Sequence, residues 1–380
     1  DRIFYCISYA VFAVPLMQFY VFFIPPFQVP DESSHFARAY QLTQGEFFPT
    51  KQPDPDAPGE YTVGGTTDPG IYLAAGKLTY LQFNSAKKYS INKAVEVNRY
   101  TWRDGEMRDT RSVSVNAPTF YAIPALGVVL GQYLDKSIVQ TLTLSRLING
   151  FFAFVVSCIA LLALRRGFGV MFVLLLMPMT VAQMASSSQD ATCFAIAALC
   201  VALLSRLNTE LPRRNRRLCL LWSTLLMITV IAARTPYAAL SLFFLYFAYA
   251  FRDRPAIVVE CCVAFAVTWI GTILWALYVA LYVSVPFGLE GANWGEQARF
   301  VLQSPLEWLG ILAESWRQRW NFYLGSFIGI VGHLDTKFPT PYFFLTGVTL
   351  GLAFFMSYWP ERRTFFRSMR EQALVPGLIV

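Results

Sequence analysis

Two carboxylates and one of only two histidines directly follow the first long apolar run of the chain. Asp31, Glu32 and His35 lie within Pro30–Phe36, just after residues 3–26. Acidic side chains are costly inside hydrocarbon, but at its edge they can be wetted on one side and dry on the other. Such a setting can raise a carboxyl pKa or orient the group towards a lipid-borne ligand. We therefore predict the site of an integral membrane enzyme here, with Asp31 and Glu32 as catalytic groups.

The spacing of these residues leaves more than one role open. Helix neighbours point in different directions, so Asp31 and Glu32 need not share a ligand. One can act as a base while the other caps the helix that begins near Ser33, and plain N-capping by acidic residues is the alternative. His35 lies four residues after Asp31, where it can orient that carboxylate or bind phosphate. The alternative for His35 is an interfacial histidine whose partners are backbone groups.

Further polar motifs interrupt the later apolar runs. Asp190 ends a serine-rich turn, and it either caps the next helix or holds a metal or a sugar hydroxyl. Arg234 and Tyr237 bracket an expected turn; the planar guanidinium suits phosphate, with snorkelling to lipid headgroups as the alternative. His333 and Asp335 follow a glycine-rich run, where they form a turn only or line the same site.

The composition is that of a membrane protein. Of 380 residues, 55% are hydrophobic, 16% are aromatic and only 14% are charged, against about 25% charged in soluble domains. The net charge of +7 arises from short basic clusters between apolar runs, which is the positive-inside pattern and argues against a nucleic-acid partner. The seven cysteines lie in or beside apolar runs and form no CxxC metal motif. The predicted fold class is an all-α polytopic membrane protein.

The basic clusters determine which apolar runs are counted as crossings. Residues 118–134 are apolar but short, with an internal proline, and counting them as a crossing inverts every later cluster. We therefore predict a helix lying in the interface there, and a second one at residues 306–320, where Trp308, Trp316 and Trp320 share a face. The predicted crossings are residues 3–24, 141–164, 170–183, 191–204, 218–233, 237–251, 257–286 and 342–358. All four polar motifs then face outside.

The same reasoning divides the chain into five parts. They are a first transmembrane helix (1–24), an extracytoplasmic loop with juxtamembrane helices (25–140), a transmembrane bundle (141–286), a second extracytoplasmic segment (287–341) and C-terminal transmembrane helices, expected to be incomplete (342–380). Within the loop we predict a short amphipathic helix at 33–44 ending near Gly45, a loop at 51–70, and a solvated subdomain or mobile loop at 87–111. Residues 325–332 are expected to dip into the membrane.

Several motifs resemble those of one protein family. They are Pro30-Asp31-Glu32-x-x-His35-Phe36-x-Arg38-Ala39, Arg146-Leu147-Ile148-Asn149, Ser187-x-Gln189-Asp190-Ala191, Arg234-Thr235-Pro236-Tyr237 and Gly329-x-x-Gly332-x-Leu334-Asp335-Thr336-x-x-Pro339. In this order they resemble a bacterial family of multi-pass membrane proteins of unknown function, grouped with the GT-C glycosyltransferase superfamily. The resemblance covers nearly the whole chain. His333 departs from it, since an aromatic such as Trp is expected there, so a ligand role for His333 is discounted.

The resemblance implies a GT-C-like helical bundle and an inverting hexosyl- or pentosyltransferase of the bacterial cytoplasmic membrane, with its active site facing outside. A polyprenyl-phosphate sugar would be the donor, a cell-envelope glycan or lipid the acceptor, and Asp31 the catalytic acid by position. The expected substrate-binding residues are His35, Asp190, Arg234, Tyr237 and Asp335. Whether a metal or another cofactor takes part stays open, a divalent cation being one candidate.

Two other functions compete with this one. A transporter or flippase of lipid-linked saccharide predicts ionisable residues near mid-membrane, and the predicted crossings are almost free of them. A non-catalytic assembly partner predicts that Asp31, Asp190 and Arg234 lie far apart.

Overall fold

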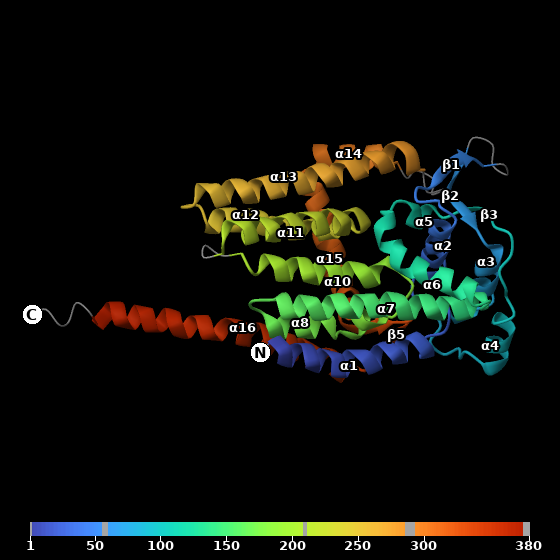
Figure 1. Ribbon diagram of the computed structural model, residues 1–380, viewed down its shortest axis with the longest axis horizontal. Coiled ribbons are helices and arrows are strands. Elements are labelled where there is room, and N and C mark those ends of the chain that lie inside the picture. Colours follow the sequence, from blue (N-terminus) through green and yellow to red (C-terminus); the bar gives the residue numbers. More distant parts are fainter. Residues whose placement is uncertain (1, 55–59, 208–210, 286–292, 375–380) are drawn as a thin grey trace, which may run out of the picture.

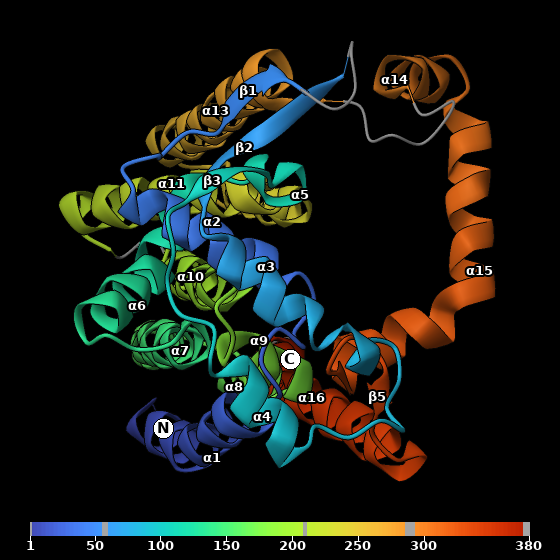
Figure 2. The same ribbon diagram turned by 90° about the vertical axis from the view of Figure 1, so that its right-hand side faces the viewer.

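The computed structural model is an elongated helical bundle with a mixed α/β unit at one end (Figure 1). It describes residues 2–54, 60–207, 211–285 and 293–374. The long helices run along the longest axis, and residues 24–137 form most of the unit at their end, which we call the polar unit (Figures 1 and 2). The prediction of an all-α polytopic membrane protein is confirmed.

Among the described residues, five helices are long and apolar enough to cross a membrane. They are α1 (Arg2–Phe23), α7 (Ile138–Ala163), α11 (Arg213–Ala233), α13 (Pro255–Tyr278) with the π-helix η4 (Val279–Val283), and the first part of α16 (Thr340–Leu374). They match the crossings predicted at 3–24, 141–164, 218–233, 257–286 and 342–358, although residue 286 itself lies outside the described residues. Their apolar length fits the roughly 20 residues that a bilayer core requires.

The remaining apolar segments are shorter or broken. They form α8 (Phe168–Leu175), α9 (Pro178–Met184), α10 (Gln189–Leu204), η3 (Thr235–Ser241) and α12 (Leu242–Ala250). The predicted crossing at 170–183 is wrong as a single helix, because Pro178 cannot donate to the preceding turn and starts a new helix there. Helices α9 and α10 meet at a bend of 117°, and only the two together are long and apolar enough to cross a membrane.

The polar unit contains a three-stranded antiparallel sheet where a loop was predicted. Strands β1 (Thr50–Pro53), β2 (Tyr61–Thr67) and β3 (Glu106–Asp109) pair in the order β1-β2-β3. The prediction of a loop at 51–70 is therefore wrong. Gly64 is required in this sheet, because a Cβ there would lie 2.0 Å from the carbonyl oxygen of Arg108. Short helices complete the unit: α3 (Pro69–Gly76), η1 (Thr79–Leu81), α4 (Ile91–Val97), α5 (Arg111–Ser114) and η2 (Pro118–Tyr121).

Helix α2 (Glu32–Thr43) is the buried centre of the polar unit. A helix was predicted at 33–44, and the turn after it uses Gly45 at φ +81°. The prediction of one apolar face is too narrow, since Glu32 and every residue from His35 to Leu42 are buried. Phe36 and Tyr40 pack against Trp102, with ring centroids 6.3 and 5.4 Å apart. Glu32 and His35 thus lie on a largely buried helix, and Asp31 directly precedes it.

Helix α6 (Ala122–Tyr133) packs antiparallel along the start of α7. A Cβ on Gly127 would lie 2.3 Å from the Cα of Ser145, and one on Gly131 would lie 2.3 Å from the hydroxyl of Thr141. The glycines let the two backbones approach closely. Residues 118–134 are correctly left out of the crossings, but the predicted helix in the membrane plane is corrected to one that lies along α7.

Helix α15 differs from the bundle in direction. It covers Pro305–Gly329, follows α14 (Trp294–Gln303), lies across the spans in Figure 1 and stands apart from the bundle in Figure 2. The helix predicted at 306–320 is part of α15. Residues 325–332, which were expected to dip into the membrane, form the end of α15 and the start of a hairpin of β4 (Ile330–Val331) and β5 (Thr336–Lys337). Residues 375–380, where a further C-terminal helix was predicted, lie outside the described residues.

Candidate functional site

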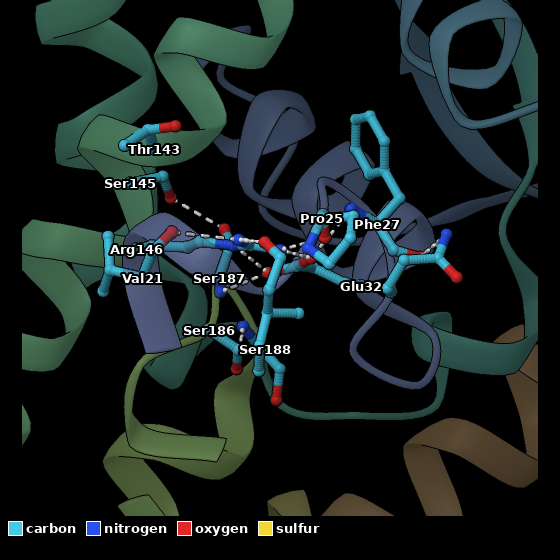
Figure 3. Close-up of polar contacts among 12 residues, drawn as sticks. Val21, Pro25, Phe27, Glu32, Thr143, Ser145, Arg146, Ser186, Ser187 and Ser188 are labelled. Carbon is cyan, nitrogen blue, oxygen red and sulfur yellow. Dashed lines mark hydrogen bonds and ion pairs between the residues drawn. The ribbon is translucent and has the colours of Figure 1, made fainter. Parts of the chain in front are cut away.

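A buried ion pair joins the start of α2 to α7. The Arg146 Nε donates to Glu32 Oε1 at 2.8 Å and Nη2 donates to Oε2 at 2.5 Å (Figure 3). The two side chains are 2% and 0% exposed. Such a fork-to-carboxylate pair restricts the geometry of both partners.

Backbone groups complete the shell around this pair. Arg146 also donates to the carbonyls of Val21, Ile24 and Pro25 at the end of α1, at 2.8–3.2 Å. Glu32 accepts from the amides of Phe27 and Ser187, both at 3.1 Å (Figure 3). The pair therefore ties together the end of α1, the start of α2, α7 and the turn before α10. Glu32 serves the fold here, and its oxygens have no free side to present to a substrate.

The serine-rich turn before α10 is also firmly bonded. Ser188 caps α10 by accepting from the Asp190 amide at 2.9 Å. Asn149 donates to the carbonyls of Ser186 and Ser188 at 2.9 and 2.8 Å. Since Ser188 is the cap, the reading of Asp190 as a plain helix cap fails, and its carboxylate is available for another partner.

That partner is Arg234, which directly follows α11. The Arg234 Nε and Nη2 donate to the two carboxylate oxygens of Asp190, each at 2.8 Å. The side chains are 41% and 22% exposed, so the pair lies at the border between protein and surroundings. The structure thus brings together two of the predicted site residues that are 44 positions apart.

His35 faces the same region from α2. Its Nδ1 lies 2.7 Å from the hydroxyl of Tyr121, and the side-chain amide of Asn116 donates to that hydroxyl at 3.3 Å. With Asn116 donating, Tyr121 can donate to Nδ1, which leaves the imidazole proton on Nε2. Burial lowers the pKa of His35, and the charges of Asp190, Asp31 and Glu32 oppose that shift. His35 is therefore neutral at pH 7.

Asp31 is the exposed member of the group. It precedes α2 with φ 57°, a left-handed conformation that few residues other than glycine adopt, and its side chain makes no capping bond. Its carboxylate has no hydrogen-bond partner among the residues the structure describes. Its charge acts on His35 alongside those of Asp190 and Arg234. Asp31 therefore presents an open carboxylate beside a polar cluster that is otherwise satisfied.

The comparison with known families agrees with this architecture. The model of one family, DUF2142, described as a predicted membrane protein, matches residues 16–375. The chain belongs to the DUF2142 family. No curated protein and no solved structure matches it. This match confirms the predicted resemblance to a family of membrane proteins.

Tyr237 and Asp335, the two remaining predicted site residues of this DUF2142 protein, lie in different parts of the structure. Tyr237, in η3, lies next to Arg234, because its backbone N–H donates to the Arg234 carbonyl at 3.1 Å, and the charges of Asp190 and Arg234 act on its hydroxyl. The Asp335 carboxylate instead accepts from the backbone N–H of Asn84 at 3.1 Å and from the Thr336 hydroxyl at 3.0 Å. The bond to Asn84 holds the β4–β5 turn against the polar unit. None of the contacts described for Asp335 reaches Asp190, Arg234 or His35.

The sequence of this DUF2142 protein leaves open whether a metal ion takes part. Within residues 2–54, 60–207, 211–285 and 293–374, no three His, Cys, Asp or Glu side chains lie close enough together to hold a metal ion. Both oxygens of Asp190 face Arg234, and Asp31 has no second carboxylate in contact with it.

Sequence reasoning missed three residues that shape the site in this DUF2142 protein. Arg146 was noted only as part of a family-like stretch, and Tyr121 and Asn116 were not noted at all. An arginine inside an apolar run requires a buried partner, and that rule could have linked Arg146 to one of the few acids at the membrane edge. No comparable signal marks Tyr121 among so many aromatic residues.

Proposed function

We propose that this DUF2142 protein is an inverting glycosyltransferase of the GT-C type, moving a sugar from a polyprenyl-phosphate donor to a cell-envelope glycan or lipid on the outer side of the bacterial cytoplasmic membrane. The observation that carries the proposal is Asp31, which combines a left-handed backbone with an exposed carboxylate that has no hydrogen-bond partner among the described residues. It lies directly before Glu32, which is anchored in the Arg146 network. A strained residue in a fixed position is typical of functional sites.

The proposed reaction uses Asp31 as a general base. Asp31 accepts the proton of the acceptor hydroxyl, whose oxygen attacks the anomeric carbon. The bond between that carbon and the phosphate oxygen breaks, and polyprenyl phosphate leaves with the electron pair. In this proposal Arg234 balances the negative charge of the leaving phosphate. His35 and Tyr121 are 2% and 0% exposed and bond each other at 2.7 Å, so in this reaction they support the site from within the fold.

The test is sugar transfer by the purified protein from a radiolabelled polyprenyl-phosphate sugar to extracted envelope acceptors. Asp31→Asn should lower kcat by at least a hundredfold, because the amide cannot take the proton. Asp109→Asn, an exposed change in β3, is the matched control and should keep full activity. Undiminished transfer by Asp31→Asn removes Asp31 from this role.

The second candidate is a transporter or flippase of lipid-linked saccharide. The broken α9–α10 pair favours it, because bent half-helices form the substrate sites of many transporters. An assay in liposomes that contain the protein distinguishes the transporter from the transferase. Movement of the lipid-linked sugar between leaflets without transfer to an acceptor supports transport, whereas a covalent product supports the transferase.

A further inference from the structure

An apolar cavity of ≈ 660 Å³ lies between helices of the bundle, and Tyr237, three residues after Arg234, is one of its lining residues. Its wall is built from α8, α10, α12 and α16, with Met171, Ala198, Phe243 and Phe354 among the lining residues. The volume falls within the range of about 300–1,000 Å³ that is usual for small-molecule sites. The polar site therefore has an apolar neighbour of ligand size.

Helix α10 connects the cavity to the polar site. The residues that it contributes to the wall are Phe194, Ala197, Ala198 and Val201. These follow Asp190 at intervals of 4, 7, 8 and 11, so they share one face of the helix with it. At 1.5 Å per residue, the wall runs about 10 Å along α10, and Asp190 lies one turn beyond its end.

The end of the cavity near Asp190 is polar. Tyr237 lines the cavity, and the charges of Asp190 and Arg234 act on it. Two nitrogens of Arg234 bind Asp190, and in the described part of the chain its third, Nη1, has no hydrogen-bond partner. The phenol of Tyr237 in the wall, together with the guanidinium of Arg234, which follows the end of α11 and is not itself part of the wall, suits a molecule with an anionic head and an apolar chain.

We propose that this cavity binds the isoprenoid chain of a polyprenyl phosphate next to its phosphate, with the phosphate held by Arg234 and Tyr237. The inference rests on the proposed function and assigns the donor lipid a place inside the bundle. A membrane phospholipid has the same chemistry, namely a phosphate on an apolar chain, so the experiment includes both lipids.

The probe is a polyprenyl phosphate without a sugar and with a photoreactive group in its first isoprene units. After illumination of the purified full chain, labelled peptides should come from α10 and α12. Ala198→Trp fills the cavity and should reduce this labelling at least tenfold. Val263→Trp is the matched control, because Val263 is 54% exposed on α13 and does not line the cavity.

Ala197→Leu, a smaller filling change, replaces Ala198→Trp if the latter does not purify as a single species. Undiminished labelling in a folded filling variant overturns the proposal. A photoreactive phosphatidylglycerol should label the same peptides less than one tenth as strongly, and equal labelling overturns the assignment to the donor lipid. The labelling assay does not depend on sugar transfer. Selective labelling of a protein that shows no transferase activity would therefore refute the proposed function and still support the lipid-binding site.

Discussion

At the scale of single residues, adjacent acids have opposite environments. Asp31 is exposed and unpartnered, while Glu32 is buried and accepts four hydrogen bonds from Arg146 and two amides. The sequence predicted that both acids matter, but it could not divide their roles, because the partner of Glu32 is 114 positions away. In the proposed reaction Asp31 is the reactive group, and the bonds of Glu32 keep it in place.

Glu32→Gln should destabilise the protein strongly. Removing one member of a buried pair leaves Arg146 with an uncompensated charge, at a cost of about 3–5 kcal/mol. The measurement is the midpoint of thermal unfolding in detergent. Glu314→Gln breaks an exposed pair with Arg317 and is the control, with no expected change in midpoint. Equal midpoints for the wild type and Glu32→Gln would show that the buried network is dispensable.

Acidification should destabilise the protein through His35. Burial lowers the pKa of His35 in the folded state below its ordinary value of 6.5, so below that pH the unfolded chain binds more protons than the folded one. Stability is then full above about pH 6.5 and falls with decreasing pH, by up to about 1.4 kcal/mol per unit.

His35→Gln tests this dependence, because glutamine can still accept a hydrogen bond from Tyr121 and does not titrate. Its unfolding midpoint should vary less between pH 7 and pH 5 than that of the wild type. Both proteins are first compared at pH 8, where His35 is neutral in either state. Parallel pH profiles would mean that other groups cause the acid sensitivity.

At the scale of helices and strands, apolar length predicted the crossings well and polar sequence predicted the loop poorly. Of the eight predicted crossings, five are single helices long and apolar enough to span in the described part of the chain, since a bilayer core allows few other structures. The segments 170–183, 191–204 and 237–251 are broken or shorter. Residues 51–70 were assigned to a loop from their Pro, Gly and Asp content. The alternation in Tyr61–Thr67 was too short and too rich in glycine to reveal a strand that is stabilised by β1 and β3.

The close contact of α6 with α7 can be tested at Gly127. A Cβ there would meet the backbone of Ser145, so Gly127→Ala should push the helices apart and cost about 1–3 kcal/mol. Gly76→Ala is the matched control, because nothing lies within 4 Å of its added Cβ, and a gain of about 0.5–1 kcal/mol is expected. The unfolding midpoints of both variants provide the measurement. Equal midpoints would contradict the close approach.

At the scale of the whole molecule, the polar unit and the short basic clusters lie at opposite ends of the bundle. Helix α7 runs from the polar unit towards Arg165 and Arg166, while α11 and α13 begin at Arg213 and Pro255 and run towards it (Figure 1). This arrangement follows the positive-inside rule if the polar unit faces outside. The bonding around Glu32, Asp190 and His35 could not be predicted from the sequence, because it joins residues that are 114, 44 and 86 positions apart.

The central claim is that Asp31 acts on the outer side of the membrane, and cysteine labelling in intact bacteria tests it most directly. In a cysteine-free background, Ser85→Cys marks the polar unit and Asn215→Cys marks the basic end, and both positions are exposed. We predict that a membrane-impermeant maleimide labels position 85 in intact cells and position 215 only after permeabilisation. The reverse pattern would place Asp31 in the cytoplasm and contradict the proposed reaction.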